Sequence, residues 1–142
     1  DVTEQIRLPE TSLYASAVSA HPAVRAHLLE MQRKLARENN VVMDGRDIGT
    51  CVLPNAQLKI FLTASVEVRA KRRYDELVAK GEQCDLAEIE KDISERDYRD
   101  MHREIAPLKA AEDAVMLDSS DLNIDEVVEA IYEQAKKAGL DA

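Results

Sequence analysis

The stretch from Val41 to Ser65, VVMDGRDIGTCVLPNAQLKIFLTAS, decides how the fold is interpreted. It contains two short, mainly apolar runs, Val41–Met43 and Leu58–Leu62, which are typical of strands covered on both faces of a parallel sheet. The loop between them opens with the charged sequence Asp-Gly-Arg-Asp at 44–47. Because ligands of open parallel sheets bind beyond the carboxyl ends of the strands, this loop is a candidate binding site. The alternative is a salt-bridged turn whose charges are only solvated.

Around this stretch, apolar periodicity and capping signals predict alternating helices and strands. A third strand is predicted at 114–117, and Asn123 opens a capping box for the final helix. That helix is expected to turn Ile124, Val127, Val128 and Ile131 inward. The other helices are predicted over 12–20, 22–39, 65–81 and about 85–104. This alternation predicts an α/β fold with a parallel sheet flanked by helices, forming a single unit over residues 1–142.

Composition limits the classes of function. The chain has 142 residues, of which 45% are hydrophobic, enough for one domain around a single core. A formal net charge of −9 argues against nucleic acid or an anionic membrane surface as the main partner. The two cysteines, Cys51 and Cys84, lack zinc-site spacing and fit a reduced, cytoplasmic setting. No apolar run approaches the length of a membrane span.

Arginine is concentrated in two groups within this acidic chain. Of 19 basic residues, 11 are arginine, and six of these lie in the clusters 69–73 and 96–103. On a helix, Arg96, Asp100 and Arg103 lie within about 60° of one another and share a face. Guanidinium groups bind phosphate through two parallel hydrogen bonds, so the pattern suits a phosphoryl-transfer site. The alternative is a network of exposed ion pairs, which contribute only ~0–1 kcal/mol each.

Several strings, in this order and at this spacing, resemble bacterial cytidylate kinases from about residue 1 to residue 138. They are DGRDIGT (44–50), KIFLTAS (59–65), RAKRRY (69–74), ERDYRD (95–100), REIAPL (103–108) and LDSSDLNIDEV (117–127). The resemblance implies a P-loop nucleoside monophosphate kinase fold, similar to adenylate kinase, with a mobile lid at about 69–104. It also implies transfer of the γ-phosphoryl group from ATP, with Mg²⁺, to CMP or dCMP in pyrimidine nucleotide metabolism.

The resemblance further implies roles for individual residues on the acceptor side. The cytosine ring is expected to contact the Ser16 hydroxyl, the Arg25 guanidinium and the Asp47 carboxylate. The CMP phosphate is expected to contact Arg46 and Arg103. The sugar is expected to contact Arg96 and Asp100, with Arg96 also within reach of phosphate. A carboxylate facing the amino group of cytosine is sensible chemistry, because that amino group is a donor.

On the donor side, the resemblance implies that arginines in or beside the lid close over the ATP phosphates. Those positions are Arg69, Arg72, Arg73 and Arg99. Asp44, at the end of its predicted strand, is expected to help hold the magnesium shell, so that the catalytic set is Asp44 with Arg46, Arg96 and Arg103. No metal site made by this chain alone is predicted.

One departure from the family is serious. The family begins with a strand and a G-x-x-x-x-G-K-[ST] loop that holds the donor phosphates, whereas this sequence has four glycines and no Gly-Lys pair. The sequence is therefore expected to be the C-terminal portion of such a kinase and to have negligible activity alone. Residues 1–20 are expected to form the end of the CMP-binding insert and the helix that follows it. Its sheet is expected to lack the central strand. The N-terminal part of the same protein, or strand or domain exchange with another copy, would fill the gap.

Two other functions stay open from sequence. One is a non-catalytic nucleotide-binding or assembly fragment that keeps the CMP residues. The other is a kinase for UMP or AMP, although uracil would place a carbonyl against Asp47, an unfavourable pairing of acceptors.

Overall fold

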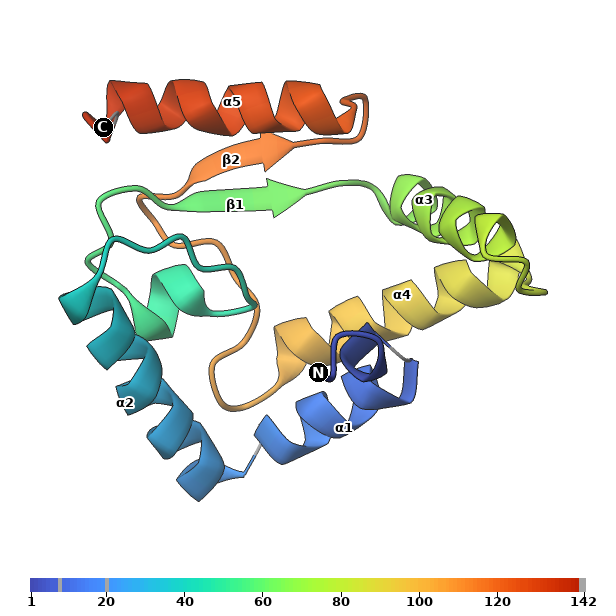
Figure 1. Cartoon of the computed structure of the whole chain (residues 1–142), viewed down its shortest axis with the longest axis horizontal. Helices are drawn as coiled ribbons and strands as arrows, with labels where there is room; N and C mark the ends of the chain where they lie inside the picture. Colours follow the sequence, from blue (N-terminus) through green and yellow to red (C-terminus); the bar gives the residue numbers. More distant parts are fainter. Residues whose placement is uncertain (8, 20, 141–142) are drawn as a thin grey trace. The chain divides into compact units, whose positions relative to one another are not determined.

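The structure, a computed structural model, describes residues 1–7, 9–19 and 21–140, which form two compact units, Asp1–Asp44 and Gly45–Ala142 (Figure 1). The single unit over 1–142 stays a prediction, because compact units of one chain can belong to one domain. So does its division into the end of an insert with the following helix at 1–20 and a lid at about 69–104.

The first unit is helical. A 3₁₀ turn, η1 (Gln5–Arg7), precedes α1 (Pro9–Ser19) and α2 (Pro22–Glu38). Pro22 occupies the first turn of α2, where its fixed φ suits the helix and its missing N–H costs nothing. The predicted first helix begins three residues earlier than expected, at Pro9, and Ala20 lies outside the described residues.

The predicted strand at Val41–Met43 is wrong. These residues form no strand, and Val42 is fully exposed. A β-branched run is held in a strand only by a neighbouring strand with which to exchange hydrogen bonds. Among the described residues of the unit that contains this segment, there is no strand with which it could pair.

The second unit is built on two parallel strands, β1 (Ile60–Thr63) and β2 (Val115–Asp118), with Ile60 opposite Val115 and Thr63 opposite Asp118. Both strands were predicted, each shifted by one or two residues. Among the described residues β1 has β2 as its sole partner, so its other edge is open. The prediction of an α/β fold with a parallel sheet that is incomplete in this chain is therefore confirmed.

Three helices and a short π-helical turn surround this sheet (Figure 1). The turn, η2 (Ile48–Val52), follows the Asp-Gly-Arg-Asp loop, and α3 (Val66–Ala79) follows β1. Helix α4 (Leu86–His102) packs against α3, and α5 (Ile124–Lys137) is the last helix of the unit in chain order. Local signals set the helix ends: Ser65 caps α3 by accepting a hydrogen bond from the Val68 amide at 3.3 Å.

The last helix has the predicted capping box. The Asn123 side chain accepts from the Glu126 amide at 3.0 Å, and Glu126 Oε2 accepts from the Asn123 amide at 2.8 Å. Gly139, with φ of 70°, ends the helix in the left-handed region that glycine adopts freely. Both boundaries were therefore predictable from local sequence.

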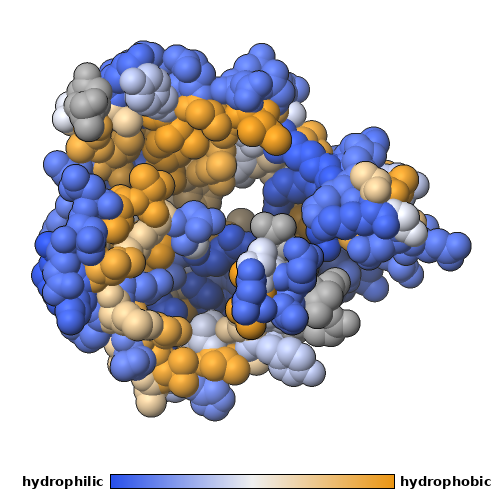
Figure 2. All heavy atoms as spheres, viewed as in Figure 1, coloured by the Kyte–Doolittle hydropathy of each residue, from blue (hydrophilic) through white to orange (hydrophobic). Residues whose placement is uncertain are grey.

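An apolar area of the second unit is uncovered. Figure 2 shows apolar side chains gathered where the strands and α5 lie in this view. Exposed large residues lie on both faces of the sheet, with Leu62 on one face and Met116 on the other, and on α5 at Ile124, Val128 and Tyr132. The expectation that Ile124 and Val128 point inward is wrong, since they are 82% and 59% exposed. Ile124 and Val128 belong to an apolar stripe of α5 of the kind that is normally buried, but no element in the described part of the chain covers it.

Candidate functional site

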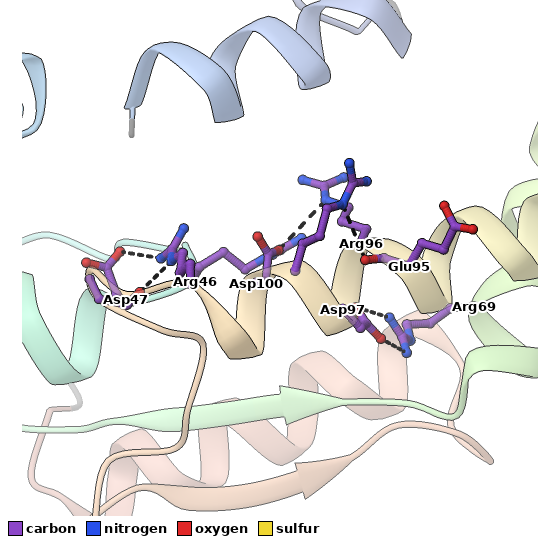
Figure 3. A network of polar contacts seen from close by, with 10 residues as sticks. Arg46, Asp47, Arg69, Glu95, Arg96, Asp97 and Asp100 are labelled. Carbon is purple, nitrogen blue, oxygen red and sulfur yellow. Dashed lines mark hydrogen bonds and ion pairs between the residues drawn. The ribbon is translucent and has the colours of Figure 1, made fainter. Parts of the chain in front are cut away.

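The predicted acceptor site in the second unit lies where the Asp-Gly-Arg-Asp loop meets the carboxyl-terminal half of α4. The Arg46 Nε donates to Asp100 Oδ2 at 2.9 Å across 54 positions of sequence (Figure 3). The Asp100 side chain is 11% exposed and that of Arg46 is 45% exposed. The charged loop is therefore attached to α4 through a nearly buried carboxylate, while the arginine remains open to solvent.

Arg103 makes the second connection between these segments. Helix α4 ends at His102, so Arg103 leaves the helix instead of continuing its face as predicted. The chain then turns sharply, with Ala106 at φ of 50° and the Leu108 amide bonded to the Asp100 carbonyl at 2.8 Å. This turn aims the Arg103 side chain back at the loop, where Nη2 lies 3.9 Å from Asp47 Oδ1.

The donors of Arg103 are only partly used. Its Nε donates to the Ala106 carbonyl at 2.6 Å, which fixes the plane of the guanidinium. Its Nη2 is buried and makes no hydrogen bond within the part of the chain that the structure describes. An unsatisfied buried N–H is unfavourable, so this group favours an additional oxygen acceptor.

A third arginine borders the same carboxylate. Arg96 lies one helical turn before Asp100, with its Nε 3.9 Å from Asp100 Oδ2, and its side chain is 49% exposed. Arg46, Arg96 and Arg103 thus form, with Asp47 and Asp100, one cluster of three cations and two carboxylates. The structure brings together five of the predicted residues, and we call this group the arginine cluster.

Two of the arginines predicted to contact ATP are held by other groups. Arg69 binds Asp97 of α4 through both terminal nitrogens, at 3.1 and 2.6 Å. Arg72 donates through Nη2 to the carbonyls of Ser119 and Leu122, at 2.6 and 3.0 Å, and so attaches α3 to the β2–α5 loop. These bonds fix α3 against its neighbours. The ATP roles of both residues stay predictions.

The other two predicted ATP contacts make only local bonds. Arg73 pairs with Glu76 one turn along α3 at 2.8 Å, and Arg99 donates to the Glu95 carbonyl at 3.3 Å. Glu76 also accepts from Lys80 at 2.6 Å, and these hydrogen bonds, first from Lys80 and then from Arg73, lower the pKa of the Glu76 carboxyl to about 2. Such intrahelical pairs at the surface are ordinary features of a solvated helix.

The remaining predicted site residues belong to the first unit. Arg25 lies in the first turn of α2, and Asp44 is exposed at the end of the unit. Ser16 lies in α1, but its side chain is outside what the structure describes. Their roles at the cytosine ring and at magnesium stay predictions. Within the described residues, no group of three or more His, Cys, Asp or Glu side chains is arranged to hold a metal ion.

Sequence reasoning missed two residues that shape the site. Asp97 is the partner of Arg69, and Lys59, with a side chain only 8% exposed, bonds both oxygens of Asp113 at 2.8 Å and the Pro54 carbonyl. Lys59 thus attaches the loop before β1 to the one before β2, and its hydrogen bonds lower the pKa of the Asp113 carboxyl. The long sequence separations gave no local signal for either pairing.

Comparison with known proteins agrees with this architecture. A family model described as cytidylate kinase matches residues 1–137. That match assigns the chain to the P-loop nucleoside monophosphate kinase fold, with which the parallel sheet flanked by helices is consistent. Curated cytidylate kinases of Streptococcus pneumoniae strains Hungary19A-6 and 70585 are each 55% identical over 137 residues, which is 96% of this chain. The chain belongs to the cytidylate kinase family.

The match covers only part of those relatives. It spans 61% of the length of each, so a considerable portion of a complete family member has no counterpart in this sequence. Among the described residues, no helix is both long and apolar enough to cross a membrane.

Proposed function

We propose that this sequence supplies the acceptor half of an enzyme that transfers the γ-phosphoryl group of ATP to CMP or dCMP. The observation that carries the proposal is the arginine cluster, which places three guanidinium groups around the end of α4, one of them with a buried and unbonded N–H. Membership of the cytidylate kinase family, whose relatives of this chain include cytidylate kinases of Streptococcus pneumoniae, supports the reaction.

The cluster suits a nucleoside monophosphate because it combines fixed cations with fixed carboxylates. Arg46, whose side chain is 45% exposed, is open to the phosphate dianion, whereas Arg103 is more enclosed and has its Nη2 buried near Asp47. Asp100 and Asp47 already lie against these two arginines before the ligand arrives. Preorganised donors of this kind stabilise charge that develops during transfer without reorganising at that moment. The hydroxyl groups of a ribose could be accepted by a carboxylate such as Asp100.

The donor half requires more than this sequence contains. ATP with Mg²⁺ would be held mainly by a G-x-x-x-x-G-K-[ST] loop, which the sequence lacks. We propose that in the complete enzyme a strand carrying that loop pairs with the open edge of β1 and helps cover the apolar area formed with α5. The greater length of the relatives and the exposure of Leu62 and Ile124 support this assembly. Strand exchange between copies is the alternative route to the same closure.

An acceptor panel tests the proposed reaction. The complete gene product and the 142-residue chain would each be incubated with ATP, Mg²⁺ and one of CMP, dCMP, UMP or AMP, and formation of ADP followed. We expect the complete product to prefer a cytosine acceptor by about 100-fold or more in kcat/KM, because uracil would place an acceptor against Asp47. The 142-residue chain should bind CMP without turnover.

Two results would count against the proposal. Equal or better use of UMP or AMP would show that the acceptor is misassigned. Binding of CMP without phosphorylation, in a preparation verified by mass to contain the phosphate-binding loop, would instead favour a non-catalytic nucleotide-binding protein.

A further inference from the structure

Arg69 connects three elements of the second unit. Its Nε donates to the carbonyl of Ala64, just after β1, at 2.9 Å. Its two terminal nitrogens meet the two oxygens of Asp97 on α4, Nη1 to Oδ1 at 3.1 Å and Nη2 to Oδ2 at 2.6 Å. The side chains of Arg69 and Asp97 are 34% and 22% exposed, so the pair is partly shielded from water. Figure 3 shows Asp97 directed at Arg69 and Asp100 directed at Arg46.

The position of Asp97 on α4 matters because of its neighbours on the same helix. At about 100° per residue, Asp100 lies about 60° around the helix from Asp97, and Arg96 lies about 40° beyond Asp100. A rotation of α4 by one such step would move Asp100 away from Arg46 and bring a different side chain toward the loop. Anything that fixes the rotation of α4 therefore also fixes the arginine cluster.

We propose that Arg69 and Asp97 form a positioning pair that sets the rotation of α4 and so aligns Arg96 and Asp100 with Arg46. Neither member needs to touch the nucleotide. This role differs from the contact with ATP phosphates expected from sequence, because three of the bonds that a guanidinium can donate are already committed to Ala64 and Asp97.

The geometry distinguishes this pair from the ordinary surface ion pairs of the same helices. Lys91 and Glu95 on α4 approach only to 3.9 Å, with side chains 74% and 59% exposed, and both belong to one helix. The Arg69–Asp97 pair is bidentate, partly buried and joins two helices to the end of a strand. Bidentate pairing fixes orientation as well as distance, which a single contact between flexible side chains does not.

Replacing Asp97 by asparagine gives a test in which the two explanations predict opposite changes in the affinity for CMP. The D97N change removes a negative charge near a site for an anionic nucleotide, so electrostatics alone predicts slightly tighter binding of CMP. Loss of alignment predicts weaker binding. Glu95→Gln is the matched control, because it removes one negative charge from an exposed position of the same helix. In the complete gene product we expect D97N to raise the Kd of CMP at least fivefold, while E95Q leaves it unchanged or slightly lower.

A double-mutant cycle tests whether the two residues act together. Arg69→Lys keeps the charge but loses the bidentate geometry, so it should weaken CMP binding to a similar extent. The double variant should be no weaker than either single variant, since each change already breaks the same pair. Equal effects of D97N and E95Q, or additive effects of R69K and D97N, would overturn the proposal.

A second measurement does not depend on nucleotide binding. In ¹⁵N spectra, the Nε–H of Arg46 should be protected from exchange by its bond to Asp100 in the wild-type protein and in E95Q, and should lose this protection in D97N. Retained protection in D97N would refute the positioning role. The role rests on the proposed CMP site only for its functional effect: if wild-type protein fails to bind CMP while protection behaves as expected, the proposed function fails and the positioning pair stands.

Discussion

Replacing Arg103 by methionine should separate phosphate recognition from folding. Methionine keeps an unbranched apolar stem of similar length but has no charge and no donors. In the structure the Nε of Arg103 is committed to the Ala106 carbonyl at 2.6 Å and its Nη2 is buried near Asp47, so Nη1 is the nitrogen that remains for an acceptor phosphate. A hydrogen bond between charged groups contributes ~1.5–3 kcal/mol.

That free energy converts into a large kinetic effect. At ~1.4 kcal/mol for each factor of ten, the R103M variant should lose about 10- to 10²-fold in kcat/KM for CMP. Interactions made equally in the bound state and the transition state appear mainly as a raised KM. Steady-state kinetics of the complete gene product with varied CMP at saturating ATP measure both parameters.

The control for this experiment is Lys91→Met, which removes one positive charge from an exposed position of α4. It should leave the kinetics within about twofold of wild type, because exposed charges at a distance are screened by salt. Thermal unfolding of both variants checks that they remain folded. A folded R103M protein with an unchanged KM for CMP would remove Arg103 from the site and refute the reasoning.

Three further predictions concern stability and pH. Lys59→Met should lower the melting temperature of the protein by ~3 °C or more, because the bonds to Asp113 and to the Pro54 carbonyl are lost. Circular dichroism measures this temperature, and an unchanged value would show that the connection is not stabilising. The folded-state pKa of Glu76, about 2, lies below the ordinary value of 4.5, so its stabilising effect is present above pH 4.5 and lost as the pH falls toward 2. The difference in unfolding free energy between wild type and Glu76→Gln should shrink over that range in urea titrations, and a pH-independent difference would contradict it. Asn123→Ala should lower the free energy of unfolding by ~1 kcal/mol through loss of the capping box, whereas Asn55→Ala, at a position in the loop before β1, should have little effect.

Local signals in the sequence predicted most helix boundaries correctly. Ser65, Asn123 and Gly139 act on the residues next to them, through a cap hydrogen bond or a left-handed turn, so no distant part of the chain can overrule them. The parallel strands were also predictable, because short apolar runs between helical segments are typical of strands.

The failures share a physical cause, which is dependence on partners far away in sequence. Val41–Met43 has the composition of a strand, but the described residues of its own unit contain no strand to pair with it. Ile124 and Val128 have the periodicity of an inward face but are exposed. The arginine contacts show the same difference between local and distant partners. Periodicity placed Arg96 and Asp100 on one face, but it could not show that Arg69 is held by Asp97, 28 positions later.

Selective ¹⁵N labelling of arginine, followed by titration of the complete gene product with CMP, is the most direct test of the acceptor site. Binding of the CMP phosphate should shift the Nε–H signals of Arg46, Arg96 and Arg103, while the signal of Arg37 in the last turn of α2 serves as an internal reference. Saturable shifts at Arg46, Arg96 and Arg103, with Arg37 unshifted, would confirm that these guanidinium groups hold the acceptor. Saturable binding of CMP without shifts at Arg46 and Arg103 would contradict it.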